Sequence, residues 1–280
     1  MTPPPTRIGP RTFGWGERTY IVGILNITPD SFSGDGLAAA GEVTDRALVR
    51  ARAMVAEGAD MLDIGGESTR PGHALVPADE EVARVVPVLR ALRTELPEVP
   101  LSVDTTKLAV AEAALDAGAD LLNDVWGVGQ DDRRMRLAAD RGVPLILMHN
   151  RVEPVYADLI AEVLADLAGA IERAVAAGCA VESLIVDPGF GFGKTAAHNL
   201  ELLRRLPELH ALGRPVMLGA SRKSTLGRIL DLPVDERLEA TLATTTLAAS
   251  AGIELVRVHD VRANVRAARM TDAIVHGDVP

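Results

Sequence analysis

The stretch AEGADMLD, residues 56–63, recurs along the chain at intervals of sixty residues. It returns as DAGADLLN at 116–123, and as AAGCA at 176–180 followed by LIVD at 184–187. A looser fourth copy is SAGIELVR at 250–257. Each copy follows an alanine-rich amphipathic stretch and leads into a short apolar run. The central glycines (58, 118, 178 and 252) are therefore expected to end helices in the left-handed conformation, each ahead of a strand buried on both faces.

Four further apolar runs alternate with these copies, at 20–25, 101–103, 143–148 and 215–218. The chain thus has eight predicted strands, separated by helical patterns at 41–57, 78–95, 106–117, 131–140, 158–177, 196–206, 235–251 and 261–275. Eight strand–helix units in 280 residues predict an α/β fold of the (β/α)8 TIM barrel type. The barrel proper is expected at about 20–275, within a single domain at 1–280. A doubly wound sheet is the alternative, but no linker rich in Pro, Gly or Ser divides the chain.

Residues 11–20, with Gly14-Trp15-Gly16 near their centre, predict a short N-terminal hairpin that covers the bottom of the barrel. Aromatic residues are only 3% of the chain. Half of them fall in loops on one face of the predicted barrel, where flat ligands would need to be covered: Phe32, Trp126, Phe190 and Phe192.

The composition restricts the compartment and the partners. A formal net charge of −10 argues against DNA, RNA or an anionic membrane as a partner. Cys179 is the only cysteine, so no disulfide forms within the chain, and a small buried side chain is expected there. No apolar run approaches the roughly 18 residues of a membrane span. Residues 1–6 show no secretory pattern, so a cytoplasmic protein is expected.

Every predicted strand ends in a polar residue. In chain order these are Asn26, Asp63, Asp104, Asn123 with Asp124, His149, Asp187, the run 221–223 (Ser-Arg-Lys), and Arg257 with His259. A single aspartate before a helix is most often an N-cap. Polar residues on all eight strands are harder to explain as caps. In a (β/α)8 barrel the active site forms where the strands end, so one polar site is predicted there.

The polar residues suggest two kinds of ligand group. Asp104, Asn123, Asp187 and Lys223 suit an amino-heterocycle with a guanidine-like edge, because buried charges need partners. The alternative for Asp104 and Lys223 is a buried ion pair without function. A second, cationic group suits phosphate and lies partly after the seventh and eighth strands. It comprises Arg70, Lys223, Arg257 and His259.

Two loops add to this interpretation. Asn26 followed by Asp30 could hold Mg²⁺, which takes few protein oxygens and completes its shell with phosphates. An ordinary surface arginine is the alternative for Arg70. The segment DPGFGFGK at 187–194 lacks the GxxxxGK[ST] spacing of a phosphate loop. Its glycines instead suggest a backbone that passes close to a flat ligand, with Phe190 or Phe192 covering it.

Seven motifs together resemble the dihydropteroate synthase family. They are GILNITPDSFS at 23–33, DIGGESTRPG at 63–72, SVDT at 102–105, NDV at 123–125, DPGFGFGK at 187–194, GASRKS at 219–224 and RVHDV at 257–261. The resemblance implies a transferase of folate biosynthesis that is a target of sulfonamides. Such an enzyme condenses (7,8-dihydropterin-6-yl)methyl diphosphate with 4-aminobenzoate to 7,8-dihydropteroate and diphosphate, by ionisation of the C–O bond and attack of the arylamine. It further implies Mg²⁺ and a homodimer, with the C-terminal helices as candidates for its interface.

The resemblance also assigns roles to individual residues. Catalysis is expected from Asp104, Lys223, Arg257 and His259. The pterin is expected on Asp104, Asn123, Met148, Asp187, Phe192 and Lys223. The diphosphate is expected on Thr69, Arg70, Arg257 and His259, the aminobenzoate on Phe32, Pro71, Phe192 and Ser224, and Mg²⁺ on Asn26. Two segments depart from the family pattern: SGDG at 33–36, and NRVEP at 150–154 after Met148 and His149.

Two other functions compete with this one. A pterin-binding domain that passes a methyl group from a folate to a corrinoid would share the pterin-holding Asp and Asn. A non-catalytic paralogue would bind the pterin only. The methyltransferase domain does not need the segment 69–71, Lys223 or Arg257, and paralogues of the second kind have lost motif residues. Since this chain keeps all of them, a synthase is favoured.

Overall fold

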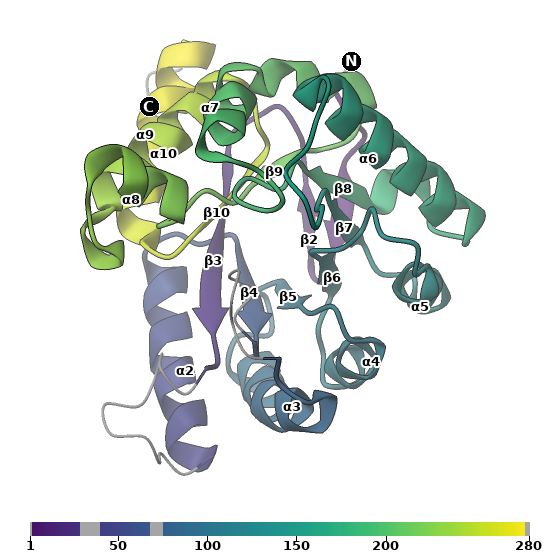
Figure 1. The fold of residues 1–280 in the computed structure, drawn as a ribbon. Helices are drawn as coiled ribbons and strands as arrows, with labels where there is room; N and C mark the ends of the chain where they lie inside the picture. The colour runs from purple at the N-terminus through teal and green to yellow at the C-terminus, as the bar shows by residue number, and fades with distance from the viewer. Residues whose placement is uncertain (1, 29–39, 68–74, 278–280) are drawn as a thin grey trace.

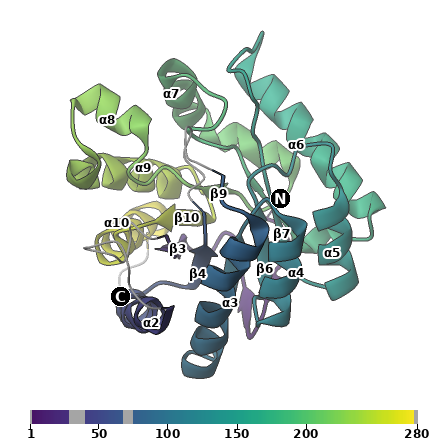
Figure 2. The same cartoon turned by 60° about the horizontal axis from the view of Figure 1, so that its bottom comes forward.

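The protein is a TIM barrel, with eight parallel strands inside and helices outside (Figure 1; Figure 2). The computed structural model describes residues 2–28, 40–67 and 75–277. The barrel strands are β3 (Tyr20–Asn26), β4 (Met61–Gly65), β5 (Leu101–Asp104), β6 (Leu121–Asp124), β7 (Leu145–Met148), β8 (Leu184–Asp187), β9 (Met217–Leu218) and β10 (Leu255–Val258). They pair in the order β8-β7-β6-β5-β4-β3-β10-β9. A parallel bridge between Val186 and Val216 then brings β8 back beside β9.

The outer layer follows the predicted helical patterns to within about three residues. It consists of α2 (Ala40–Ala56), α3 (Ala78–Glu95), α4 (Leu108–Asp116), α5 (Arg133–Arg141), α6 (Leu159–Ala176), α7 (Ala196–Arg204), α9 (Leu238–Ser250) and α10 (Val261–His276). Shorter elements are the helix α8 (Ser224–Leu230) and the 3₁₀ turns η1 (Val181–Ser183), η2 (Leu206–Leu212) and η3 (Val234–Glu236). Within the described ranges, no helix combines the length and the apolar character needed to cross a bilayer.

The repeated glycines behave as predicted. Gly58, Gly118, Gly178 and Gly252 all have positive φ values, between 76° and 105°. This left-handed conformation ends the preceding helix and turns the chain into the next strand. Cys179, directly after the third of these glycines, is buried and unpaired, as expected.

The interior of the barrel has an apolar floor. Alternate residues of a strand point to the same side, so every second residue faces the barrel axis. One inward layer is apolar and consists of Val22, Met61, Leu121, Ile146, Ile185, Met217 and Leu255. Two positions further along four of these strands stand Asp63, Asn123, Asp187 and Arg257. The polar site therefore rests directly on a packed apolar layer.

An N-terminal hairpin covers the bottom of the barrel, but it lies earlier than predicted. It pairs β1 (Thr6–Ile8) with β2 (Arg11–Phe13) through a turn at 9–10. The turn at 14–17 serves another purpose, because the hydroxyl of Tyr20 bonds both the N–H and the C=O of Gly14. The rings of Phe13, Trp15 and Tyr20 pack together, with centroids 4.8 to 5.7 Å apart. They join the apolar floor and close it from below.

Candidate active site

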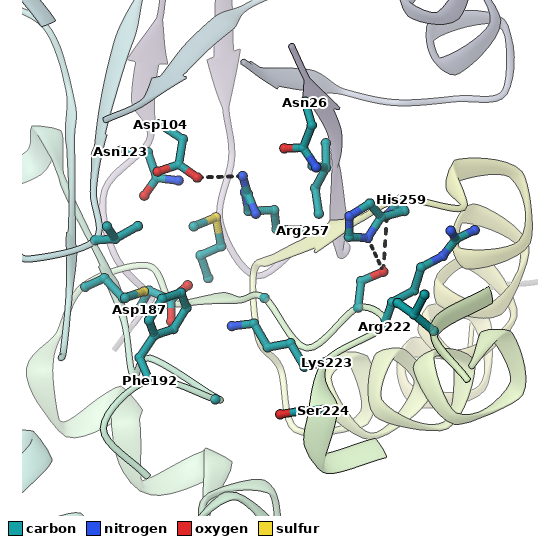
Figure 3. Close-up of a pocket in the computed structure, with 18 of the residues that line it drawn as sticks. Asn26, Asp104, Asn123, Asp187, Phe192, Arg222, Lys223, Ser224, Arg257 and His259 are labelled. Carbon is teal, nitrogen blue, oxygen red and sulfur yellow. Dashed lines mark hydrogen bonds and ion pairs between the residues drawn. The ribbon is translucent and has the colours of Figure 1, made fainter. Parts of the chain in front are cut away.

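A cavity of about 400 Å³ opens at the carboxyl ends of the strands. Ten of the fourteen predicted site residues line it: Asn26, Asp104, Asn123, Met148, Asp187, Phe192, Lys223, Ser224, Arg257 and His259. Figure 3 labels all of these side chains except Met148 and shows them around one space, contributed by strands and by the loops that follow them. The other four, Phe32, Thr69, Arg70 and Pro71, lie outside the described residues. The strand-end rule therefore locates one site, and the loop predictions stay open.

Arg257 lies inside the barrel among carboxylates. Its Nε donates to Asp63 Oδ2 at 2.5 Å and its Nη2 donates to Asp104 Oδ2 at 2.8 Å, with 16% of the arginine side chain exposed. From the sequence, Asp104 is expected to bind the heterocycle and Arg257 the phosphate. In the structure the two residues form one ion pair (Figure 3). The sequence contained a signal for this position: Arg257 stands two residues after Leu255, which faces the barrel axis, so its side chain faces the axis as well.

Three buried oxygens beside this pair have no hydrogen-bond partner among the described residues. They are Oδ1 of Asp63, Oδ1 of Asp104 and Oδ1 of Asn123. The amide nitrogen of Asn123 is engaged, since it donates to Asp63 Oδ2 at 3.0 Å. Buried acceptors are nearly always satisfied in proteins. The free oxygens of Asp104 and Asn123, which line the cavity, therefore suit a ligand that donates hydrogen bonds.

Burial shifts the pKa values of the charged groups in the cavity. It raises the pKa of Asp104 to about 7, an effect that the nearby Arg257 guanidinium opposes. It also raises the pKa of Asp187, whose Oδ1 accepts from the Gly189 N–H at 2.7 Å. The pKa of Lys223 is lowered to about 8 by burial and by the charge of Arg257, against the attraction of Asp187. Burial therefore disfavours the charged forms of these groups, and a ligand that offers them hydrogen bonds or opposite charge would stabilise those forms.

A strained turn presents Lys223 to the cavity. Arg222, just before it, has a φ of 56°, which is uncommon for a residue with a side chain. The Arg222 guanidinium is held by Asp260, with Nε 2.9 Å from Oδ2, and its backbone N–H donates to Thr241 Oγ1 at 3.1 Å. Arg237 donates to the Arg222 carbonyl at 3.0 Å. These three supporting residues were not predicted, because they lie 15 to 38 residues away along the chain.

Two further predicted residues, His259 and Asn26, line the cavity. The Nδ1 of His259 lies 3.0 Å from the Ser221 hydroxyl, which also accepts the His259 backbone N–H at 3.2 Å (Figure 3). Asn26 ends β3 and faces the same space. Arg228, Arg237 and Glu67 also line the cavity, although none of them was predicted.

The two phenylalanines of the 187–194 segment differ in their surroundings. Phe192 lines the cavity, and its ring centroid is 4.3 Å from Lys223 Nζ. Phe190 is fully buried in the outer hydrophobic core, so the interpretation that it covers a ligand is wrong. Phe190 contributes its backbone to the site, because its carbonyl accepts a hydrogen bond from Lys223 Nζ. Trp126 lies on the expected face but does not line the cavity.

His149 points away from the cavity, although it follows β7 like the other strand-end residues. Its side chain is fully buried, with Nε2 3.1 Å from Asp166 Oδ2 and Nδ1 2.9 Å from Lys194 Nζ. Burial and the charge of Lys194 lower the pKa of His149 to about 3. The ring is therefore neutral near pH 7.

We expect His149→Gln to remove part of the acid sensitivity of the fold. The unfolded chain takes up a proton on His149 below about pH 6.5, whereas the folded chain resists it down to about pH 3. Its contribution to stability is therefore complete above pH 6.5 and is lost as the pH falls. Between pH 7 and 4.5 the wild type should lose roughly 2–3 kcal/mol more than the variant. Urea unfolding at both pH values measures this, and equal losses would contradict it.

Comparison with known proteins agrees with this geometry. A family model described as pterin binding enzyme matches residues 22–259. The dihydropteroate synthase of Clostridium beijerinckii is 48% identical, over 96% of this chain and 99% of that protein. That of Bacillus subtilis is 46% identical, over 95% of this chain and 92% of that protein. The chain belongs to the dihydropteroate synthase family.

Solved structures of this family superpose on the whole barrel. The Clostridium difficile dihydropteroate synthase, determined in the presence of pteroic acid, has a TM-score of 0.90 and 47% identity, covering 94% of this chain and 98% of that one. The Xanthomonas albilineans enzyme with 4-aminobenzoic acid has a TM-score of 0.91 and 42% identity, covering both chains fully. A Yersinia pestis dihydropteroate synthase with a sulfonamide drug complex has a TM-score of 0.89 and 42% identity, covering 97% of this chain and 99% of that one.

Proposed function

We propose that the cavity condenses (7,8-dihydropterin-6-yl)methyl diphosphate with 4-aminobenzoate to give 7,8-dihydropteroate and diphosphate. The observation that carries this proposal is the pair of buried, unpartnered oxygens on Asp104 and Asn123, in a cavity that also contains Lys223 and Arg257. The amino and ring N–H groups of a pterin supply the donors that these oxygens lack. The relatives determined in the presence of pteroic acid and with 4-aminobenzoic acid support a pterin and an aminobenzoate as substrates.

The residues divide the work of the reaction. Asp104, Asn123 and Asp187 accept hydrogen bonds from the pterin, while Lys223 donates to its ring, and Phe192 and Met148 flank it. The C–O bond breaks first, and both electrons leave with the diphosphate. The carboxylates of Asp104 and Asp187 stabilise the positive charge left on the pterin. Arg257 and His259, with Thr69 and Arg70, stabilise the departing anion.

The arylamine completes the reaction. Ser224 and Phe192 line the cavity, and Phe32 and Pro71 are assigned to the same aminobenzoate pocket. The neutral amine nitrogen forms a bond to the methylene carbon and then releases its proton to solvent. Exclusion of water protects the cation until the amine arrives.

Mg²⁺ is part of the proposal, with Asn26 as its protein ligand. Asn26 presents an amide oxygen to the cavity, beside Gly65 of the neighbouring strand. The described ranges contain no cluster of three or more His, Cys, Asp or Glu suited to a metal. A single amide oxygen suits Mg²⁺, because this ion takes most of its ligands from phosphates and water. When bound, Mg²⁺ would neutralise charge on the leaving diphosphate.

Release of diphosphate tests the function. We expect release that needs the pterin diphosphate and Mg²⁺, increases with 4-aminobenzoate and is inhibited by a sulfonamide. Methyl transfer from a folate to cobalamin without diphosphate release would instead show a methyltransferase domain. A folded sample that binds pteroic acid but releases no diphosphate would show a non-catalytic paralogue.

We further propose a homodimer that uses the C-terminal helices. Leu247 of α9 and Met270 and Ile274 of α10 are 41%, 63% and 69% exposed, which is high for large apolar side chains. Light scattering should give the mass of a dimer, and Ile274→Arg should reduce it to that of a monomer. The cytoplasmic location stays a prediction.

A further inference from the structure

Lysine is rare in this protein and lies only around the active face. The chain has three lysines, Lys107, Lys194 and Lys223, among 29 basic residues. They follow β5, β8 and β9 respectively, so all three lie at the carboxyl ends of strands. Lys223 lines the cavity and Lys107 pairs with Glu67 and Glu81. Lys194 has no function in the scheme above. An ammonium is compact and has three donors, unlike the planar guanidinium of arginine. The acceptors around Lys194 therefore indicate why a lysine stands at this position.

The Lys194 ammonium has a matched set of three acceptors. Its Nζ lies 2.9 Å from His149 Nδ1 and 3.2 Å from the carbonyl oxygens of both Gly189 and Phe192. The opposite ring nitrogen of His149 bonds the Asp166 carboxylate, so Nε2 carries the proton and Nδ1 is free to accept. Every N–H of the protonated lysine is therefore used. Within the described ranges Lys194 forms no salt bridge with a carboxylate.

The backbone around this ammonium is the loop that presents Phe192. Gly189, Gly191 and Gly193 all have positive φ values, of 69°, 82° and 52°. A Cβ on Gly189 would lie 1.8 Å from the His149 carbonyl oxygen, so the loop passes very close to the end of β7. On its inner side the loop receives a hydrogen bond from Lys223 to Phe190. The loop is thus held by one lysine from the cavity and by the other from behind.

We propose that Lys194 is a positioning residue for the pterin site: its ammonium binds the carbonyls of Gly189 and Phe192 and thereby holds the Phe192 ring against the ligand. Lys194 does not line the cavity, so it acts through the loop. The inference rests on the proposed function of the cavity, since the ligand that Phe192 contacts is the pterin. It adds a residue that the seven motifs contain but whose role the reaction scheme leaves open.

Protonation of Lys194 should govern this hold. Burial lowers the pKa of Lys194 to about 7. The charged groups around it act in both directions: Asp187 and Asp166 raise the pKa, and Lys223 and Arg151 lower it. The remaining neighbours are the neutral ring of His149 and the ring of Tyr156, whose centroid is 6.0 Å from Nζ. Below pH 7 all three bonds form. Above it, the amine loses its charge and one donor, so the loop is held less firmly.

Calorimetric titration with pteroic acid between pH 6 and 9 tests the proposal. The ratio of the Kd of Lys194→Met to that of the wild type cancels the titration of the ligand itself. We expect a ratio of about ten at pH 6, since a charged hydrogen bond is lost, and a clearly smaller ratio at pH 9, where the neutral amine of the wild type has lost its charge and one donor. Lys107→Met is the matched control: because the pKa of Lys107 is raised by its glutamate partners, its ratio should not change with pH. If the ratio for Lys194→Met does not change with pH, the side chain supports the loop by packing alone and the proposal is wrong.

A second measurement keeps the wild-type protein intact. With ¹³Cε-labelled lysine the spectrum contains only three lysine signals, and Lys194→Arg assigns one of them. If the protonated form binds pteroic acid about tenfold better, saturating ligand must raise the pKa of Lys194 by about one. An unchanged pKa overturns the inference. Failure of the wild type to bind pteroic acid would overturn the proposed function together with this inference, whereas binding with a constant ratio overturns this inference alone.

Discussion

Arg257→Met is expected to abolish turnover and to lower the free energy of unfolding by roughly 3–5 kcal/mol. The guanidinium pairs with two carboxylates, on Asp63 and Asp104, which are 1% and 5% exposed. Its removal leaves both carboxylates buried without their counter-charge. Because Arg257 also lines the cavity, binding of pteroic acid and of diphosphate should both weaken. Urea unfolding and calorimetric titration with each ligand give the two quantities.

The size of this effect should depend on pH and on burial. Arg257 lowers the pKa of Asp104, which is about 7 in the wild type, so removal of Arg257 should raise that pKa further. Asp104 of the variant is then protonated already above pH 7, so the stability deficit of Arg257→Met should shrink as the pH falls towards 7. Arg141→Met is a matched control, because its pair with Asp116 is 40% and 62% exposed. Exposed pairs contribute less than about 1 kcal/mol. Loss of diphosphate binding alone, with pteroic acid binding intact, would contradict the shared role of Arg257.

Lys223→Met is expected to weaken pteroic acid binding by about a hundredfold and to lower kcat further. The substitution keeps the length of the side chain but removes a donor that faces the cavity. It also leaves the buried carboxylate of Asp187 with less positive charge nearby, as the depressed pKa of Lys223 and the raised pKa of Asp187 indicate. Losing one partner of a buried charged contact costs a few kcal/mol.

The stability of Lys223→Met should change much less than that of Arg257→Met. Lys223 bonds a backbone carbonyl, that of Phe190, and stacks on Phe192, whereas Arg257 neutralises two carboxylates. Calorimetry with pteroic acid and steady-state diphosphate release measure the two effects. Unchanged pteroic acid affinity would count against this cavity as the pterin site.

Local patterns predicted the barrel well because each strand–helix unit carries its own signals. Gly58, Gly118 and Gly178 marked three turns from helix to strand, and a polar residue marked the end of each strand. These signals depend on neighbours along the chain, so one sequence suffices to find them. The polar residues at the strand ends also predicted the cavity, because the parallel strands of one barrel all end at one rim.

The errors arose where distant parts of the chain decide the outcome. The hairpin was predicted around the turn at 14–17, but Tyr20 uses that turn to seal the floor, and strand pairing moves to the turn at 9–10. Phe190 and Phe192 are two residues apart in a glycine-rich loop, and only tertiary packing sends one into the core and one to the cavity. Lys194 and His149 are 45 residues apart, so no local pattern shows that they touch.

The three packed rings under the barrel (Phe13, Trp15 and Tyr20), here called the aromatic plug, give this protein a built-in optical probe. Its two tryptophans stand at opposite ends of the barrel, Trp15 in the plug at 3% exposure and Trp126 in the loop after β6 at 37%. Fluorescence of a shielded indole lies at shorter wavelength than that of an indole in contact with water. Emission from Trp15 should therefore follow the opening of the floor, and emission from Trp126 should follow events near the substrate entrance. Unlabelled protein can thus report unfolding and ligand binding as separate signals from one sample.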